Sequence, residues 1–140
     1  MTGATATQSS MEFGPGSGNP ELAIDGNADT KWKAGTCTHT RREDAPWWRV
    51  TVPIASPLQI TRVDVTNRGD SCCYQRLNGF GVSINGVACA NNVQIGKGET
   101  KQVDCAASAP AGDLTVCAAP ARRRGPFPPP PRQVQTHAAS

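Results

Sequence analysis

The stretch Trp47-Trp48-Arg49-Val50-Thr51-Val52-Pro53-Ile54 decides the fold class. Apolar side chains stand at every second position from Trp48 to Ile54, whereas Arg49 and Thr51 lie between them. This period of two is typical of a strand with one buried face, because successive side chains of a strand point to opposite sides. The stretch therefore predicts a half-buried β-strand.

The same alternation recurs in two further stretches, residues 60–67 and residues 79–84. The second stretch ends at Asn85-Gly86, a dipeptide typical of tight hairpin turns. Short strands spaced roughly ten residues apart, with Gly, Asn and Pro between them, are typical of antiparallel sandwiches and barrels. The predicted fold class is therefore all-β. Weaker strand patterns cover residues 92–95, 100–104 and 113–117.

The basic charge of the chain lies in one terminal segment. The 140 residues carry 14 basic and 11 acidic side chains, a net charge of +3, but residues 118–140 contribute four arginines and no acid. Residues 1–117 therefore carry 10 basic and 11 acidic groups. Because residues 118–140 also hold six of the 12 prolines, we expect them to form an extended or disordered tail behind one domain, residues 4–117. A nearly neutral domain gives no compositional argument for binding nucleic acid.

Six cysteines in a chain of this length indicate a disulfide framework, whose pairing the spacing leaves open. A zinc site is the alternative, but the chain offers only His39 and His137 beside them, and adjacent Cys72-Cys73 fit one tetrahedral ion poorly. Disulfides favour an extracellular location. Residues 1–10 lack the pattern of a signal peptide, so we expect a piece of a secreted protein. No run reaches the ~18 apolar residues of a bilayer span, which predicts no membrane insertion.

The loop at residues 23–30 is rich in oxygen ligands. Asp25 offers a carboxylate, the backbone around Asn27 offers carbonyls, and Thr36 in the next loop offers a hydroxyl. These hard oxygens suit Ca²⁺, although their spacing is not that of an EF-hand. The alternative is that Asp25-Gly26-Asn27 forms only a tight turn.

Two further loops gather side chains that suit a neutral ligand rich in hydroxyls, or an anion. Arg68 and Arg76 offer fork-shaped sets of donors, with Asp70 placed to orient a guanidinium, and His39 can donate or accept. The alternative is a surface ion pair between Arg68 and Asp70 beside a solvated His39. No serine or free cysteine partner for His39 is evident, and no carboxylates are paired for glycoside hydrolysis. We therefore predict a binding protein and not an enzyme.

The adjacent cysteines Cys72-Cys73 are the most unusual feature. A bridge between them closes so short a loop that it contributes little to global stability. It would instead present a firm apolar surface between Arg68 and Arg76, on which the apolar face of a sugar ring could rest. Two independent long-range disulfides are the alternative.

Together these motifs resemble the F-type lectin family, the fucose-binding lectins that share a discoidin-like β-sandwich jelly roll. The resemblance covers roughly residues 4–117, and the order and combination of its motifs are more specific than any one of them. The motifs lie at residues 6–10, 23–27, 37–40, 46–50, 67–70, 72–73, 76–77 and 98–101, followed by Cys105.

The resemblance implies a sugar site and its chemistry. In this family a histidine and two arginines hydrogen-bond terminal α-L-fucose, which here implies His39, Arg68 and Arg76. Asp70 then supports the arginine, and Trp32 helps to form a pocket for the methyl group of fucose. Because fucose lacks the 6-hydroxyl of galactose, an apolar pocket selects for it. A vicinal disulfide, Cys72-Cys73, packs on the sugar ring, and the implied partners are fucosylated glycans.

The resemblance also implies a structural calcium ion and a disulfide pairing. Asp25 matches a side-chain ligand of the ion, and the other ligand positions match Leu22, Asn27 and Thr36. The implied disulfides are Cys37-Cys117, Cys72-Cys73 and Cys89-Cys105.

Three departures from the family pattern bear on the outcome. Ser71 adds a residue between Asp70 and Arg76, which predicts a displaced Arg76. The segment 106–113 is too short for the usual further strand, so we expect the sandwich to lack C-terminal strands. Ala118 stands where the family has a calcium-binding glutamate, which predicts a weakly held ion.

Two other functions stay open at this point. The tripeptide Arg68-Gly69-Asp70 is of the integrin-binding type, which suits a discoidin-like adhesion module that acts through a protein or lipid surface. The missing strand and Ala118 suit a degenerate domain that binds nothing. Glycan linkage specificity, oligomeric state and the role of the tail are not readable from the sequence.

Overall fold

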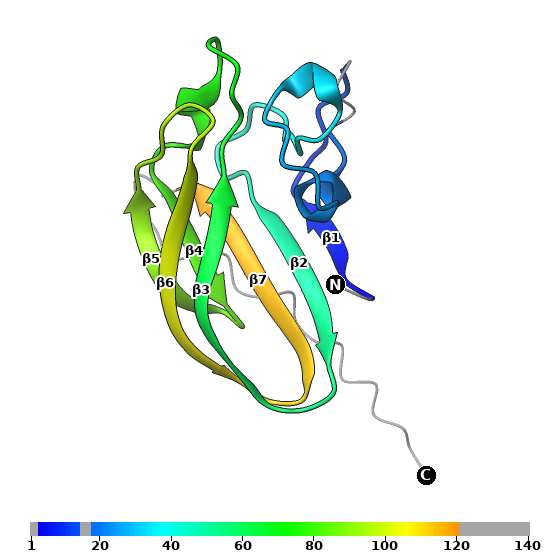
Figure 1. Ribbon diagram of the computed structural model, residues 1–140, viewed down its shortest axis with the longest axis vertical. Coiled ribbons are helices and arrows are strands. Elements are labelled where there is room, and N and C mark those ends of the chain that lie inside the picture. Colours follow the sequence, from blue (N-terminus) through cyan, green and yellow to red (C-terminus); the bar gives the residue numbers. More distant parts are fainter. Residues whose placement is uncertain (1–2, 15–17, 121–140) are drawn as a thin grey trace.

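The computed structural model describes residues 3–14 and 18–120. It is a β-sandwich in which a five-stranded antiparallel sheet, in the order β1-β2-β7-β4-β5, faces a two-stranded sheet, β3-β6 (Figure 1). This architecture confirms the predicted all-β class. The strands are β1 (Thr5–Gln8), β2 (Trp48–Ile54), β3 (Leu58–Thr66), β4 (Phe80–Ile84), β5 (Val87–Val93), β6 (Thr100–Ala109) and β7 (Gly112–Pro120).

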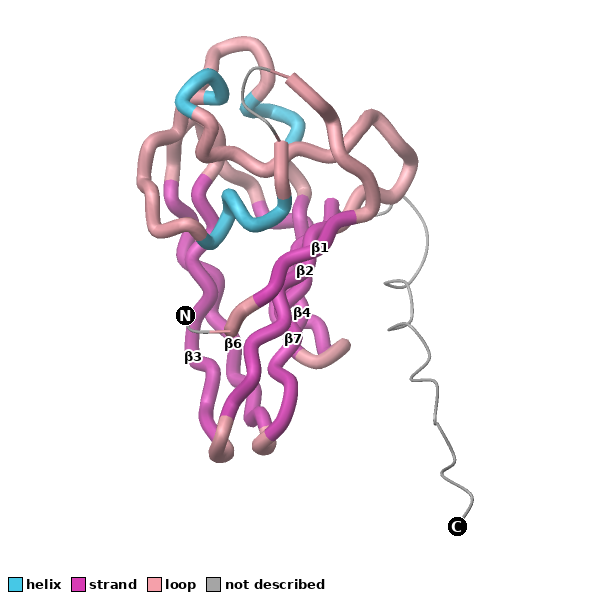
Figure 2. Tube along the Cα trace, turned by 90° about the vertical axis from the view of Figure 1, so that its right-hand side faces the viewer, coloured by secondary structure: helices cyan, strands magenta, loops and turns pink. Residues whose placement is uncertain are grey.

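The loops gather at one end of the sandwich, and the three short 3-10 helices lie among them (Figure 2). The tight connections from β2 to β3 and from β6 to β7 close the opposite end (Figure 2). The loop end therefore brings together segments from distant parts of the sequence. The 3-10 helices are η1 (Pro20–Ile24), η2 (Trp32–Ala34) and η3 (Tyr74–Leu77).

The core lies between the two sheets and is centred on β4. Phe80, Val82 and Ile84 alternate along this strand and are almost completely buried. They pack with Val103 from β6 and Leu114 from β7. Burial of such side chains contributes about 1.5–3 kcal/mol each, so this cluster stabilises the contact between the sheets. Among the described residues, no helix is long and apolar enough to cross a membrane.

Most of the predicted strands are confirmed, but one was misplaced. The hairpin turn at Asn85-Gly86 forms, with both residues in the left-handed region at φ 47° and 83°. The prediction of a strand at residues 92–95 was wrong, because β5 begins at Val87, directly after this turn, and ends at Val93. The short strand β1 was not predicted; it pairs with β2.

The C-terminal part of the sandwich has a short connection between its last two strands, and the last strand, β7, lies inside the larger sheet. β6 ends at Ala109 and β7 begins at Gly112, so no further strand fits between them, as predicted. β7 lies between β2 and β4 and continues to Pro120. Residues 118–120, which were assigned to the tail, therefore belong to the sheet. The expected disorder of the tail concerns residues 121–140, which lie outside the described residues.

Two of the three expected disulfides form. Cys89 of β5 is bonded to Cys105 of β6 and so joins the two sheets, and Cys72 is bonded to Cys73. The expected Cys37-Cys117 bridge was wrong, because both cysteines are free. β7 carries Cys117 into the five-stranded sheet, opposite Arg49, whose Nε donates to its sulfur at 3.2 Å.

The second free cysteine lies in the loop region. The Sγ of Cys37 points to the carbonyl of Thr30 at 3.7 Å, and burial raises the pKa of its thiol. The sulfur of Cys37 therefore contacts the loop that contains Thr30, whereas the sulfur of Cys117 contacts Arg49 in the five-stranded sheet.

Candidate functional site

The segment that follows β3 is anchored by a buried asparagine. Asn67 is 3% exposed, and its Nδ2 donates to the carbonyls of Tyr74 at 2.9 Å and Gly96 at 3.0 Å. Its backbone N–H donates to the carbonyl of Glu99 at 2.9 Å. These bonds tie the start of the segment to η3 and to the loop before β6. The side chains that follow Asn67 therefore project from a fixed position.

A close backbone contact holds this segment against the loop that carries η2. The N–H of Gly69 donates to the carbonyl of Thr30 at 2.7 Å, and the Nζ of Lys31 donates to the carbonyl of Gly69 at 2.8 Å. A Cβ atom at position 69 would collide with the hydroxyl of Thr30. Glycine is therefore required here by the closeness of the two chains, since its φ is not positive.

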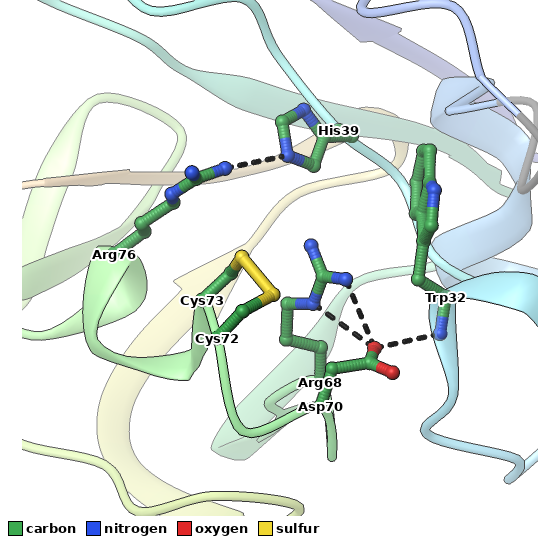
Figure 3. The surroundings of a disulfide bond; sticks show 7 residues. All are labelled: Trp32, His39, Arg68, Asp70, Cys72, Cys73 and Arg76. Carbon is green, nitrogen blue, oxygen red and sulfur yellow. Dashed lines mark hydrogen bonds and ion pairs between the residues drawn. A yellow bond between two sulfur atoms is a disulfide. The ribbon is translucent and has the colours of Figure 1, made fainter.

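Asp70 joins the two loops through its carboxylate. Its Oδ2 accepts hydrogen bonds from the backbone N–H of Trp32 at 2.8 Å and from Nη2 and Nε of Arg68 at 2.9 and 3.2 Å (Figure 3). The Trp32 N–H and, after it, the Arg68 guanidinium lower the pKa of Asp70 below its ordinary value. The carboxylate is therefore charged at neutral pH and fixes the direction of the Arg68 side chain.

The Arg68 guanidinium also lies over an aromatic ring. Its central carbon is 5.5 Å from the centroid of the Trp32 ring, a distance at which a cation is attracted to the face of an indole. The ring of His39 lies on the same tryptophan, with centroids 5.1 Å apart and planes tilted by 59°. Trp32 thus positions both Arg68 and His39.

Arg76 approaches the same histidine from η3. Its Nη1 lies 3.4 Å from Nε2 of His39 (Figure 3). Burial, followed by the positive charges of Arg68 and Arg76, lowers the pKa of His39 below its ordinary value. The ring is therefore neutral at neutral pH. A guanidinium can only donate, so a hydrogen bond from Arg76 needs Nε2 as its acceptor. The proton of the neutral ring would then lie on Nδ1, which is buried and has no hydrogen-bond partner among the described residues.

The Cys72-Cys73 disulfide lies between the two arginines (Figure 3). Cys72 is exposed and Cys73 is half-buried, so an apolar sulfur surface faces solvent. The hydrogen-bonding groups of Arg68, Arg76 and His39 surround it. An arrangement of several donors around a small apolar surface suits a ring that carries hydroxyls on its edge and C–H groups on its face.

The structure brings together every side chain predicted for the sugar site. Ser71 does not separate Arg76 from the cluster, because Nη1 of Arg76 lies 3.4 Å from Nε2 of His39. The predicted displacement of Arg76 relative to the family pattern stays a prediction. Ser71 lies in an exposed turn, with its hydroxyl 3.4 Å from Nζ of Lys97. The side chains that lie together are Trp32, His39, Arg68, Asp70, Cys72, Cys73 and Arg76 (Figure 3).

Comparison with known proteins decides the family. A family model described as a NedA-like, galactose-binding domain matches residues 22–116. The fucolectin of Anguilla anguilla is 38% identical over 113 residues, which cover 73% of this chain and 70% of that protein. The chain belongs to the F-type lectin family. It spans only 61% of Fucolectin-1 of Anguilla japonica, to which it is also 38% identical.

Two solved lectin structures share the fold. The fucolectin from the serum of Morone saxatilis (striped bass) superposes with a TM-score of 0.68 at 34% identity, over 81% of this chain and 41% of that one. The lectin domain of lectinolysin, complexed with the Lewis B antigen, superposes with a TM-score of 0.67 at 27% identity, over 89% of this chain and 85% of that one. These likenesses agree with the discoidin-like β-sandwich described above.

The oxygen-rich loop of this F-type lectin forms a series of local turns. Oδ1 of Asp25 accepts from the N–H of Asn27 at 2.8 Å, and Oδ1 of Asn27 accepts from the N–H of Asp29 at 3.0 Å. The buried hydroxyl of Thr36 donates to the carbonyl of Asp29 at 2.5 Å. The predicted ligands Asp25, Asn27 and Thr36 are therefore linked through Asp29, whereas Leu22 lies in η1.

The chemistry of this oxygen set fits Ca²⁺ in part. Carboxylate, carbonyl and hydroxyl oxygens are the ligands that Ca²⁺ prefers, and Asp25 and Asp29 lie exposed at the loop. No group of three or more acidic, histidine or cysteine side chains converges within the described residues. Ala118, where the resemblance implies a glutamate in other members, lies within β7 opposite Trp48. Of the four predicted ligand positions, only Asp25 carries a negative charge.

Sequence reasoning missed the groups that hold the site in place. Asn67, Gly69 and Lys31 make the contacts between loops, and Thr30 accepts one of them. No local pattern marks these roles, because each depends on a residue at least seven positions away. Asn67 and Gly69 belong to the motif at residues 67–70, but the sequence did not predict their hydrogen-bond partners.

Proposed function

We propose that this chain is a non-enzymatic lectin domain that binds terminal α-L-fucose on fucosylated glycans. The observation that carries the proposal is the convergence of Arg68, Arg76 and a neutral His39 around the Cys72-Cys73 disulfide. Two kinds of relative support it: the eel proteins are fucolectins, and a fucose-binding module of Streptococcus pneumoniae superposes with a TM-score of 0.63 at 29% identity. An extracellular site of action accords with fucosylated partners and with two disulfides.

The three polar side chains take complementary hydrogen-bonding roles. Arg68 and Arg76 donate to the ring oxygen and hydroxyl oxygens of fucose, since a guanidinium has five N–H donors. His39 accepts a hydrogen bond from a sugar hydroxyl at an unprotonated Nε2, in place of its 3.4 Å contact with Arg76. Asp70 does not touch the sugar but keeps Arg68 in its orientation, so that less side-chain entropy is lost on binding.

The apolar groups account for the choice of sugar. The Cys72-Cys73 disulfide packs against the C–H face of the ring, and the indole of Trp32 lines the pocket for the methyl group. A sugar with a 6-hydroxyl in place of that methyl would bury an unpaired polar group. We therefore expect L-fucose to bind more tightly than galactose.

We also propose that the loop around Asp25 binds a structural calcium ion weakly. Asp25 would provide its carboxylate, Asn27 and Leu22 their carbonyls, and Thr36 its hydroxyl and carbonyl. The single acidic ligand among these positions is the reason for the low affinity, since calcium affinity rises with the number of charged ligands. The ion would stabilise the loop beside the sugar site.

The adhesion alternative is disfavoured by the state of the Arg68-Gly69-Asp70 tripeptide. The side chains of Arg68 and Asp70 are bonded to each other and are 14% and 26% exposed, and Gly69 is buried. An integrin-type ligand must offer both charges to its partner. The buried core around β4 and the assembled cluster (Figure 3) likewise disfavour a degenerate domain.

Titration calorimetry of the full chain with L-fucose tests the proposal. We expect a dissociation constant between micromolar and millimolar, and loss of measurable heat in Arg68→Ala and in His39→Ala. Arg62→Ala is the matched control, because Arg62 is an exposed arginine on β3. A folded wild-type sample that gives no heat with fucose would overturn the proposal.

A further inference from the structure

The loop that carries His39 is attached through its backbone to the N-terminal segment of the chain. The carbonyl of His39 accepts hydrogen bonds from the N–H of Glu12 and from Nε2 of Gln8, both at 3.0 Å. Its own N–H donates to the carbonyl of Gly18 at 3.2 Å. Both the N–H and the carbonyl of His39 are therefore held by residues of the N-terminal segment.

Gln8 is the residue of this segment that belongs to the sheet. It ends β1, where it lies opposite Trp48 of β2. The next N–H, that of Ser9, donates to the carbonyl of Trp47 at 3.0 Å. The backbone of Gln8 is thus fixed by the sandwich, while its half-buried side chain extends to the His39 loop.

The side-chain amide of Gln8 joins three segments of the chain. Its Nε2 donates to the carbonyls of His39 and Gly18, each at 3.0 Å, and its Oε1 accepts from the hydroxyl of Thr38. Because a carbonyl can only accept, the two carbonyls determine which end of the amide is the nitrogen. A glutamine fits this position because it offers two donors and an acceptor on one planar group.

The junction around this amide is close-packed. Gly18 is buried, forms a β-bridge with Thr38 and has a φ of 73°. A Cβ atom at position 18 would collide with the carbonyl oxygen of Glu12. The backbone that accepts from Gln8 therefore has little room to shift while these contacts are intact.

The position of the His39 ring depends on this backbone. Among the described residues, the buried Nδ1 has no hydrogen-bond partner, and the contact of Nε2 with Arg76 is long, at 3.4 Å (Figure 3). The ring also lies against Trp32, with centroids 5.1 Å apart, but this packing contact has no hydrogen bond to fix a direction. The place of Nε2 in the site therefore follows from where the backbone of His39 is held.

We propose that Gln8 is a positioning residue of the sugar site, which acts through His39. Its amide connects β1 to the His39 loop and so sets where Nε2 meets the sugar. The inference rests on the proposed function, in which Nε2 accepts a hydrogen bond from a sugar hydroxyl. Loss of the amide leaves each carbonyl one backbone donor, from Glu12 or from His39 itself, so we expect the loop to stay folded but to shift.

Titration calorimetry of the full chain carrying Gln8→Met, with L-fucose as the ligand, tests this role. Methionine is unbranched and of similar length but has no N–H group. We expect fucose to bind about fivefold to tenfold more weakly, the effect of losing roughly one neutral hydrogen bond. Gln59→Met is the matched control, because Gln59 is an exposed glutamine of β3 that donates to the hydroxyl of Ser108 at 2.9 Å. Its affinity should stay within about twofold of wild type.

Nuclear magnetic resonance of the His39 ring separates positioning from general stability. Long-range proton–nitrogen correlation spectra report the surroundings and the protonation of an imidazole, and His137→Gln identifies the signals of the other histidine. In Gln8→Met we expect the His39 signals to shift and the pKa of the ring to move toward 6.5, because a displaced ring loses the burial that lowers it. Gln59→Met should leave both unchanged, even where thermal unfolding shows an equal loss of stability.

Thr38→Val is a milder change, since it removes only the hydroxyl that donates to the amide oxygen of Gln8. It should shift the same ring signals in the same direction, by less. A folded Gln8→Met with wild-type affinity and unchanged ring signals would overturn the proposal. If Gln8→Met does not fold, unchanged ring signals in Thr38→Val would overturn it instead. If fucose does not bind to the wild-type chain, the proposed function fails, while the ring signals still decide the role of Gln8.

Discussion

Two loop regions at the same end of the sandwich are built in different ways. The segment from Asn67 to Arg76 is held by hydrogen bonds to residues far away in the sequence, among them those from Asn67 to Gly96 and from Gly69 to Thr30. The loop from Asp25 to Asp29 is held by bonds between residues two positions apart and by one bond from the Thr36 hydroxyl to the Asp29 carbonyl, within the same loop region. The first region is therefore organised by the fold itself, whereas the second is organised locally and is open to rearrangement around an ion.

The largest contrast is expected in stability. Asn67→Ala removes the donor to two carbonyls, those of Tyr74 and Gly96, and leaves these half-buried residues without it. Groups left in this state destabilise by about 1–3 kcal/mol each, so we expect the free energy of unfolding to fall by about 2–4 kcal/mol. Urea denaturation under oxidising conditions measures it.

Asn27→Ala is the matched change in the other loop. Asn27 is exposed and its side chain accepts a single local N–H bond, from Asp29. Without calcium we expect a loss below about 1 kcal/mol, because water replaces an exposed acceptor. Equal losses at Asn67 and Asn27 would contradict the distinction between the two regions.

The next contrast concerns sugar affinity. Asp70→Asn removes the charge that orients Arg68 and weakens the link to Trp32, so we expect fucose to bind at least tenfold more weakly. Asp25→Asn removes a carboxylate of the same exposed end of the molecule, but one that contacts neither arginine. In calcium-free buffer its fucose affinity should stay within about twofold of wild type, which is well below the ~1.4 kcal/mol of a tenfold change. Calorimetry compares the two, and a similar loss in both variants would show that Asp70 has no special positioning role.

Stabilisation by calcium should depend on Asp25 and not on Asp70, whereas fucose affinity depends on Asp70 and not on Asp25. A weakly bound ion stabilises by RT ln(1 + [L]/Kd), about 1.4 kcal/mol at a concentration ten times the dissociation constant. For a domain of this size, that is a rise of a few degrees in Tm. We expect 10 mM CaCl₂ to raise Tm in wild type and in Asp70→Asn, but not in Asp25→Asn. Differential scanning calorimetry with MgCl₂ as the control ion measures it, and an equal rise in all three chains would place the ion elsewhere.

The distinction between local contacts and contacts far apart in the sequence also explains what could be predicted from the sequence. Alternating side chains mark β2 and β4, because one face of each is committed to the core. The strand β5 was misplaced because its small and polar residues, Ala88 to Asn92, show no such alternation. β1 has only four residues and forms by pairing with β2.

Within the site, the motif residues could be predicted from the sequence, but the groups that hold them in position could not. Asp70 was expected to orient Arg68, and it does so. Its bond to the backbone of Trp32 depends on how two distant loops meet, which spacing does not encode. The expected partner of Cys37 was wrong for the same reason, since the path of β7 places Cys117 between Arg49 and Ser83.

The smallest expected effect is the dependence on pH, and it belongs to the anchored region. The pKa of His39 lies below its ordinary value of 6.5, chiefly because the ring is buried and further because Arg68 and Arg76 are close. The Thr40 backbone and, more weakly, Glu12 act in the opposite sense. The unfolded chain therefore binds more protons than the folded chain as pH falls below about 6.5. The free energy of unfolding should decrease with falling pH in this window and stay level above it.

Protonation also changes what His39 can do in the site. Its Nε2 becomes a donor beside two cations, so fucose affinity should fall together with stability as the pH decreases from 7.5 to 5.5. His39→Gln removes the titration while keeping an acceptor, and should flatten both profiles. Subtraction of this variant also removes the contribution of His137, which is present in both chains. The window stays above pH 5 because the lowered pKa of Asp70 affects stability only at more acidic pH. Profiles that keep their slope in His39→Gln would assign the pH dependence to another group and leave the neutral imidazole without support.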